Sequence, residues 1–326
     1  MRILVLGATG HIGQAIVRHA LNRGRAVTAV TRQPDSPALR GLSVSILHTT
    51  EGFPALPSVA AGHDLIVDAA APYPLEACLR GSPPWRRAVA GALDHTRRVL
   101  DAALFSRARL VFISSFTTLP RPDSPLRVLE TNWRRSAYPY FEAKAAMEQA
   151  VLEAASQGLP ALIVNPAACL GPWEFRSDAS SLIRLVLGQR LSVVMDQDLS
   201  VLDVRDLAEA IDRALTLELF GRSVPIAGHN LNLIELVRQI RVLGGVDGAP
   251  PAPIDPRIAA TAAFWTSATF STFGQASPDV WRAVPLIADA FPMLPSPEQI
   301  AMGIELRPLS ATLGDAIAFH RAWRPA

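Results

Sequence analysis

A glycine-rich loop near the start of the chain constrains the fold more than any other feature of the sequence. The apolar run RILVLG, residues 2–7, has the length and composition of a buried strand. Residues 11–24 have apolar side chains at helical spacing and end on a glycine. The loop GATGHIG, residues 7–13, joins the two segments. A strand, a glycine loop and a helix in this order predict a dinucleotide-binding turn, and a tight turn without a ligand is the alternative.

Each glycine of the loop has its own role in this prediction. Gly7 permits the tight turn, Gly10 lets the backbone approach a pyrophosphate, and Gly13 lets the helix pack close to the sheet. The helix N-terminus offers free N–H groups and a partial positive charge to phosphates. We expect a lone histidine such as His11 to lie at the surface. The candidate cofactor-binding residues of the loop are Gly7, Thr9, Gly10, His11, Ile12 and Gly13.

Apolar and amphipathic segments alternate through the first half of the chain, which predicts an α/β fold. This rhythm is typical of a Rossmann-type doubly wound parallel sheet that is covered on both faces. The expected strands are 2–7, 26–32, 42–47, 64–71, 108–115 and 160–167, and the expected helices include 84–106 and 139–157.

The alternation breaks after Pro166, which indicates a second unit. We expect one more strand at 200–204, followed directly by a helix. A dinucleotide-binding domain would then span 1–170, with a return of the chain to it near 200–228. The remaining segments, 171–199 and 229–326, are expected to form a smaller, irregular substrate domain.

The end of the second strand, VTRQP, bears on the choice of cofactor. Thr31 and Arg32 occupy the place where NAD-preferring enzymes have an acidic residue that binds the ribose 2′-hydroxyl. A carboxylate would repel a 2′-phosphate, whereas a guanidinium can bind it through two hydrogen bonds. The sequence therefore favours NADP(H), with NAD(H) as the other candidate. A solvated arginine at a strand end is the alternative explanation.

Tyr140 and the only lysine of the chain, Lys144, lie four residues apart in the expected helix 139–157. This spacing places them on one face of the helix. A phenol with its ordinary pKa near 10 is a poor acid or base at neutral pH, and a nearby ammonium lowers that pKa. The pair therefore predicts a proton-transfer site, against the alternative of an ordinary exposed lysine.

Hydroxyl groups end the fifth expected strand in the run FISSF. Ligands of α/β sheets bind beyond the carboxyl ends of the strands, so Ser115 is placed to hydrogen-bond a substrate oxygen beside Tyr140. Ser114 is expected to face the cofactor or the backbone, and Thr117 is the fallback for the role of Ser115. A capping hydroxyl is the alternative for any one of them.

These motifs together resemble the extended short-chain dehydrogenase/reductase superfamily, also called the NAD-dependent epimerase/dehydratase superfamily. The carrying residues are GATGHIG, VTRQP, FISS, YFEAK and VNPAACLGP, and they look most like the dihydroflavonol reductase and cinnamoyl-CoA reductase branch. The resemblance implies that Ser115 polarises a carbonyl, Tyr140 delivers the proton and Lys144 holds the nicotinamide ribose. It further implies cofactor contacts from Pro166 and from Ala69, Ala70 and Ala71.

Three positions depart from the pattern of that family. Asp68 stands where a histidine is usual, Ala92 stands where an asparagine is frequent, and only Glu51 is close to the usual acidic residue near the adenine. These departures put the adenine contacts and any proton relay in doubt.

Three functions follow from this interpretation. The first is an NADPH-dependent oxidoreductase that reduces a ketone or aldehyde. The second is a nucleotide-sugar epimerase or dehydratase with bound NAD, and the third is a non-catalytic NADP-binding sensor. Aromatic side chains that could line an apolar substrate pocket, although each alone is more typical of a core, are Trp133, Trp173, Phe175, Trp265 and Phe270.

Net charge, cysteine spacing and the length of apolar runs limit which partners and which compartment we expect. A net charge of +2 gives no electrostatic footprint for nucleic acid. The two cysteines have no metal-like spacing, and no apolar run is long enough for a signal or a membrane span. We therefore expect a cytoplasmic monomer or homodimer that acts on a small molecule, without a metal.

Overall fold

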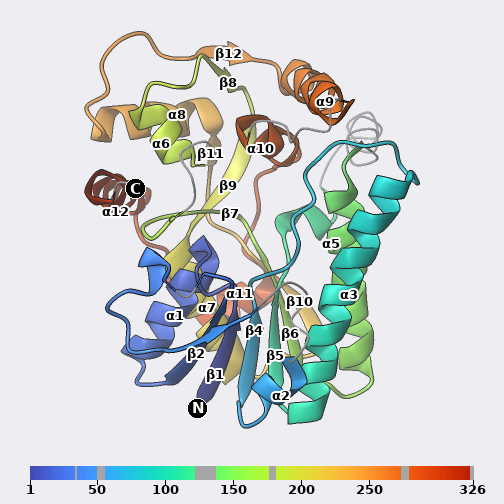
Figure 1. The fold of residues 1–326 in the computed structure, drawn as a ribbon. Helices are drawn as coiled ribbons and strands as arrows, with labels where there is room; N and C mark the ends of the chain where they lie inside the picture. The colour runs from blue at the N-terminus through green and yellow to red at the C-terminus, as the bar shows by residue number, and fades with distance from the viewer. Residues whose placement is uncertain (34, 50–55, 122–136, 176–180, 273–278, 324–326) are drawn as a thin grey trace.

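The fold was analysed in a computed structural model, which describes residues 1–33, 35–49, 56–121, 137–175, 181–272 and 279–323. Its centre is a seven-stranded sheet with the order β10-β6-β5-β4-β1-β2-β3, and every pairing is parallel (Figure 1). This is the expected Rossmann-type architecture. The strands are β1 (Arg2–Leu6), β2 (Ala26–Thr31), β3 (Ser45–His48), β4 (Leu65–Asp68), β5 (Arg109–Ile113), β6 (Ala161–Pro166) and β10 (Arg222–Ile226).

Helices cover both faces of this sheet, which explains why its central strands β1, β4, β5 and β6 are buried without alternation. In β1, Ile3 and Val5 pack into the core under α1 and α7, whereas Leu4 and Leu6 pack into the core under α3 and α5. Figure 1 shows these two helix pairs on opposite sides of the sheet. The helices around the sheet are α1 (His11–Asn22), α2 (Leu56–Ala60), α3 (Pro83–Ser106), α5 (Pro139–Ser156), α7 (Val204–Thr216) and α11 (Pro297–Met302), and two short 3₁₀ turns are η1 (Pro37–Leu39) and η2 (Phe116–Thr118).

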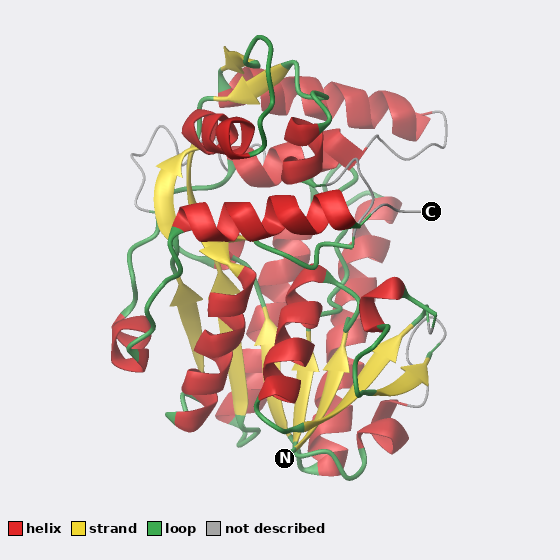
Figure 2. Ribbon diagram, turned by 90° about the vertical axis from the view of Figure 1, so that its left-hand side faces the viewer, coloured by secondary structure: helices red, strands yellow, loops and turns green. Residues whose placement is uncertain are grey.

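A smaller unit lies beyond the carboxyl ends of the large sheet. It contains a three-stranded sheet of order β11-β9-β7, a two-stranded pairing of β12 with β8, and its own apolar core. Figure 2 shows α12, which ends next to the C-terminus, on the side of this unit that faces the large sheet. The elements are β7 (Ala168–Leu170), α6 (Leu182–Leu187), β8 (Val193–Met195), β9 (Asp198–Asp203), β11 (His229–Asn232), α8 (Leu233–Leu243), β12 (Ala252–Ile254), α9 (Pro256–Thr272), α10 (Asp279–Ala288) and α12 (Leu309–Ala322).

Two expectations for the second half of the chain need correction. The strand expected at 200–204 is β9, and it pairs with β7 and β11 in the small sheet instead of extending the large one. The seventh strand of the large sheet is β10, which lies after α7 and pairs with β6. The segment from Gly244 to Pro308, part of the region expected to be irregular, contains helices α9, α10 and α11.

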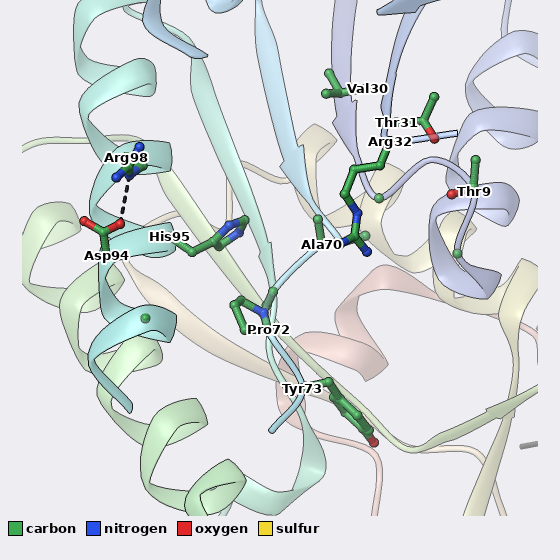
Figure 3. A pocket seen from close by; sticks show the side chains of 15 residues that line it. Thr9, Val30, Thr31, Arg32, Ala70, Pro72, Tyr73, Asp94, His95 and Arg98 are labelled. Atoms are coloured by element: carbon green, nitrogen blue, oxygen red, sulfur yellow. Dashed lines mark hydrogen bonds and ion pairs between the residues drawn. The ribbon is translucent and has the colours of Figure 1, made fainter. Parts of the chain in front are cut away.

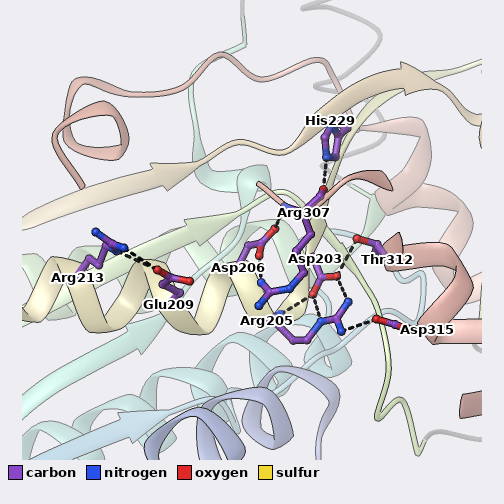
Figure 4. A network of polar contacts seen from close by, with 9 residues as sticks. All are labelled: Asp203, Arg205, Asp206, Glu209, Arg213, His229, Arg307, Thr312 and Asp315. Carbon is purple, nitrogen blue, oxygen red and sulfur yellow. Dashed lines mark hydrogen bonds and ion pairs between the residues drawn. The ribbon is translucent and has the colours of Figure 1, made fainter. Parts of the chain in front are cut away.

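A polar network fastens the small unit to the large one at the start of α7 (Figure 4). Asp203 caps α7 by accepting from the Arg205 backbone, and it pairs with the Arg205 side chain at 2.7 Å. Thr312 of α12 donates to Asp203 at 2.7 Å, and Arg205 also contacts Asp315 at 2.6 Å. Capping and cross-linking by one carboxylate fix α12 relative to α7.

None of the helices in the described part of the chain combines the length and apolarity that crossing a bilayer requires. Among the same residues, His, Cys, Asp and Glu side chains form no group that could hold a metal ion.

Candidate active site

At two positions the glycine loop adopts a backbone geometry that leaves no room for a Cβ. Gly7 has φ +76°, and a Cβ there would lie 2.5 Å from the carbonyl oxygen of Ala69 at the end of β4. A Cβ on Gly13 would overlap the backbone carbonyl of Gly7. Gly10 is the N-cap of α1 and supplies no side-chain cap, so the first N–H groups of the helix face a cavity without a side-chain acceptor.

A cavity of about 610 Å³ opens beside this loop and is called the loop cavity below. Its walls come from the glycine loop, the end of β2, the segment after β4 and one face of α3 (Figure 3). The lining residues are Gly7, Thr9, Gly10, Val30, Thr31, Arg32, Ala69, Ala70, Ala71, Pro72, Tyr73, Gly91, Asp94, His95 and Arg98.

Arg32 brings a cation into the loop cavity. Its side chain is exposed and extends toward Ala70 (Figure 3). Among the described residues it forms no hydrogen bond and no ion pair, whereas Arg98 on the opposite wall contacts Asp94 at 2.9 Å. Thr31 precedes Arg32, and its hydroxyl accepts from the backbone of Gln33 at 2.9 Å. Within the described lining of the loop cavity, Arg32 therefore carries the guanidinium that is not engaged by a carboxylate.

A second cavity of about 460 Å³, called the tyrosine cavity below, adjoins the first. The two share Gly10, Ala69, Ala71 and Tyr73 as lining residues. The tyrosine cavity is also lined by His11, Ile12, Gly13, Ile113, Ser114, Ser115, Phe116, Tyr140, Lys144, Pro166, Ala167, Ala168 and Cys169. Each residue that the sequence names as catalytic or cofactor-binding therefore lines one of the two cavities, although the roles remain predictions. Thr117, the fallback for Ser115, is not among the lining residues.

Tyr140 lies at the first turn of α5 and is only 2% exposed. Its hydroxyl is hydrogen-bonded to the side chains of Ser115, Thr117 and Tyr73. Burial raises the pKa of Tyr140 above its ordinary value, and these hydrogen bonds only partly offset the effect. The expectation of an acidified phenol is thus wrong for this state of the protein, because desolvation dominates.

The position of Lys144 explains this outcome. The ammonium donates to the backbone carbonyl of Ile113 at 3.0 Å and lies 5.3 Å from the centre of the Phe112 ring. Burial lowers the pKa of Lys144 to about 8, against the opposing charges of Asp68 and Glu148. The ammonium is therefore directed at the end of β5, and the hydrogen bonds to the phenol come from hydroxyl groups.

Ser115 and Thr117 form a hydroxyl cluster with Tyr140. Ser115 caps η2, where its side chain accepts from the Thr117 backbone at 3.2 Å and from the Thr117 hydroxyl at 2.9 Å. Ser114, expected to face the cofactor or the backbone, lines the tyrosine cavity, and its hydroxyl donates to the buried carboxylate of Glu148 at 2.5 Å. Ser115 is thus the serine whose hydroxyl points at the phenol.

An ion pair that the sequence did not predict lies in the wall of the loop cavity. Asp68 is fully buried at the end of β4, and its carboxylate lies 3.0 Å from Nε2 of His95 on α3. Burial alone would raise the pKa of Asp68, but the charge and hydrogen bond of His95 hold it below its ordinary value. In the sequence, Asp68 stands out only because the resembled family usually has a histidine there, and no short-range spacing links Asp68 to His95.

The surface position expected for His11 is wrong, and the aromatic residues named from the sequence do not line the cavities in the described structure. His11, expected at the surface, is buried and its Nε2 lies 3.1 Å from the carbonyl oxygen of Pro172. Trp173 packs under the Arg18 guanidinium at 4.9 Å, and Trp265 is 64% exposed. Neither cavity is lined by Trp173, Phe175, Trp265 or Phe270. Trp133 and Glu51 lie outside the described residues.

Comparison with known proteins agrees with this geometry. A family model described as the NAD dependent epimerase/dehydratase family matches residues 3–224. Sterol demethylase protein B of Methylococcus capsulatus is 27% identical over 276 residues, which cover 79% of this chain and 79% of that protein. A putative dihydroflavonol 4-reductase of Synechocystis sp. is 27% identical over 277 residues, which cover 82% of this chain and 77% of that protein.

The solved structure of gox2253 has the same fold. It superposes with a TM-score of 0.74 at 22% identity, covering 99% of this chain and 98% of that one. The family match spans more than half of the 326 residues and includes the glycine loop, Arg32, Ser115, Tyr140 and Lys144. The chain is therefore an NAD(P)-dependent enzyme of the extended short-chain dehydrogenase/reductase type, and it belongs to the NAD dependent epimerase/dehydratase family.

Proposed function

We propose that this enzyme reduces a ketone or aldehyde group of a small organic substrate with NADPH. The observation that carries the proposal is the hydrogen-bonded pair of Ser115 and Tyr140 in a cavity that adjoins the glycine loop. A carbonyl oxygen that approaches this pair meets two hydroxyl donors. Burial raises the pKa of Tyr140, so the phenol carries at neutral pH the proton that a reduction consumes. The hydrogen bonds from Ser115 and Thr117, which lower this pKa, would favour release of the proton to the substrate oxygen.

The glycine loop and the start of α1 fit the diphosphate of a dinucleotide. The backbone at Gly7 and Gly13 has no room for a Cβ, and the N–H groups at the helix start lack a side-chain cap. These N–H groups and the helix dipole would hold the phosphates. When bound, NADPH supplies the hydride that reduces the carbonyl carbon.

Arg32 supports the preference for NADPH over NADH. Its guanidinium lies in the loop cavity and has no partner among the described residues, so a 2′-phosphate could take both of its parallel N–H bonds. Lys144 uses one of its three donors on Ile113, which leaves donors for a ribose hydroxyl.

We assign the substrate side to the smaller unit, taken as residues 171–199 and 229–326 together with strands β7 and β9. This unit lies beyond the carboxyl ends of the strands (Figure 1), where ligands of doubly wound sheets bind. Cys169 and Ala168 bring its first strand, β7, to the wall of the tyrosine cavity. The substrate would therefore enter between β7 and the Ser115 turn.

The test is a panel of ketones and aldehydes with NADPH or NADH, followed by the loss of reduced-nicotinamide absorbance. We expect turnover with NADPH that Tyr140→Phe reduces by about 10²-fold or more. Tyr138→Phe is the matched control, since its buried hydroxyl has no hydrogen-bond partner within the described structure. Full activity of Tyr140→Phe would rule out the proposed mechanism.

An epimerase or dehydratase of nucleotide sugars is the second candidate, because the family model that matches carries both activities in its description. Such an enzyme would retain its cofactor and oxidise its substrate only transiently. Stoichiometric nicotinamide released from the denatured purified protein, together with conversion of a nucleotide sugar without net NADPH loss, would favour this candidate over the reductase.

A further inference from the structure

Two phenols of very different exposure meet at the junction of the two cavities. The ring centroids of Tyr73 and Tyr140 are 4.6 Å apart at an interplanar angle of 65°, and their hydroxyl groups are hydrogen-bonded. Tyr140 is 2% exposed, whereas Tyr73 is 52% exposed. Tyr73 belongs to the segment between β4 and α3, and it lines both cavities. Figure 3 shows its ring at the edge of the loop cavity.

The proposed reaction requires a route by which Tyr140 regains its proton, and the contact with Tyr73 can provide one. Each reduction removes the proton of Tyr140, and the resulting phenolate must be reprotonated before the next turnover. The hydroxyl groups of Ser115 and Thr117, which also contact Tyr140, belong to side chains that are 8% and 3% exposed. The Lys144 ammonium donates to the Ile113 carbonyl. Of the three side chains hydrogen-bonded to the phenol, Tyr73 is the one that reaches solvent.

We propose that Tyr73 relays protons from bulk water to Tyr140. The Tyr73 O–H bond breaks as the Tyr140 O–H bond forms, and the Tyr73 phenolate then takes a proton from a water molecule or a buffer acid. No electrons are transferred in the relay. Tyr73 therefore acts through Tyr140 and is not itself the acid that protonates the substrate.

The direction of transfer agrees with the surroundings of the two rings. Burial and the nearby charge of Asp289 raise the pKa of Tyr140. A Tyr140 phenolate therefore takes up a proton readily, and Tyr73 is its hydrogen-bonded neighbour that reaches solvent. The edge-to-face contact holds the rings in place without help from the hydroxyl groups. Tyr73→Phe therefore removes the hydroxyl that would carry the proton and keeps the ring contact.

The inference rests on the proposed function, and its test separates the first turnover from later ones. The best carbonyl substrate of the panel is mixed rapidly with enzyme and NADPH in dilute buffer. In Tyr73→Phe the first turnover should keep the wild-type rate, because Tyr140 begins protonated. Later turnovers should slow by about tenfold or more. Added imidazole buffer should restore the rate in Tyr73→Phe and leave the wild-type rate unchanged.

Each outcome has one meaning. Equal first and later turnovers in Tyr73→Phe, with no response to buffer, would overturn the relay. A slow first turnover that buffer does not correct would assign Tyr73 a structural role and also overturn it. Tyr138→Phe should behave as wild type, and thermal unfolding checks that each variant is folded. Loss of turnover in Tyr140→Phe keeps the proposed function standing even if the relay fails.

Discussion

The Asp68 carboxylate and the His95 imidazole form a buried ion pair at 3.0 Å, with the Lys144 charge close enough to act on both. Asp68 also accepts from the backbone N–H of Ala70 at 3.0 Å. The pair thus joins β4 to α3 and fixes the start of the segment that contains Ala71 and Tyr73. One electrostatic contact therefore shapes the wall that the two cavities share.

Removal of His95 should destabilise the protein strongly. In His95→Ala the buried Asp68 carboxylate keeps its desolvation cost and loses its main cation, so the free energy of unfolding should fall by about 3–5 kcal/mol. Urea denaturation measures the change, with the exposed His48→Ala as a control expected to stay within about 0.5 kcal/mol. In a double-mutant cycle, His95→Ala should lower the free energy of unfolding much less in the Asp68→Asn background than in the wild type. Additive losses would show that the pair contributes no coupling.

The ionisation of Lys144 should give the enzyme an alkaline limit. Burial lowers the pKa of Lys144 to about 8, so its ammonium is lost as the pH rises through that value. The raised pKa of Tyr140 keeps the phenol protonated over the same range. We expect kcat/KM for carbonyl reduction to fall above about pH 8 with a single ionisation. A profile that is flat to pH 10 would contradict the assigned role of the ammonium.

The ionisation of Lys144 should also make the free energy of unfolding depend on pH in a defined direction. Between about pH 8 and the ordinary lysine pKa of about 10.4, the unfolded chain binds the proton that the folded protein has lost. Stability contributed by this site therefore rises with pH across that window. Lys144→Met removes the titrating group, so the difference in unfolding free energy between wild type and variant should grow in favour of wild type from pH 7 to pH 10. Chemical denaturation at both pH values tests this sign.

Arg32 should determine the choice between the two nicotinamide cofactors. Arg32→Ala removes the guanidinium that we assign to the 2′-phosphate, and loss of such a charged hydrogen-bond pair costs about 1.5–3 kcal/mol. We expect the KM for NADPH to rise by about 10- to 100-fold while the KM for NADH changes little. Arg190→Ala, at an exposed position of the smaller unit, is the matched control. A parallel rise of both KM values would mean that Arg32 does not contact the phosphate.

The parts of the fold that short-range patterns govern were predictable from the sequence. The glycine loop is one example, because the turn at Gly7 and the packing at Gly13 depend on local backbone sterics. The pairing of β9 was not predictable, since its partners β7 and β11 are set by tertiary packing. The Asp68–His95 pair joins residues 27 positions apart on a strand end and a helix face. The direction of the Lys144 ammonium likewise depends on a carbonyl of another strand, beyond what the i, i+4 spacing with Tyr140 can specify.

The Ser115 turn offers the sharpest test of how the hydroxyl cluster works. Thr117 donates its proton to Ser115 at 2.9 Å, so the Ser115 proton is left for Tyr140 or a substrate oxygen. Ser115→Ala removes the proposed donor and should lower kcat by about 10²-fold, as loss of a single oxyanion donor does. Thr117→Val keeps the shape of the turn but removes the hydrogen bond that orients the Ser115 hydroxyl. It should lower kcat by a smaller factor. If Thr117→Val proves the more damaging substitution, Thr117 is the group that binds the substrate oxygen, and Ser115 serves to cap η2.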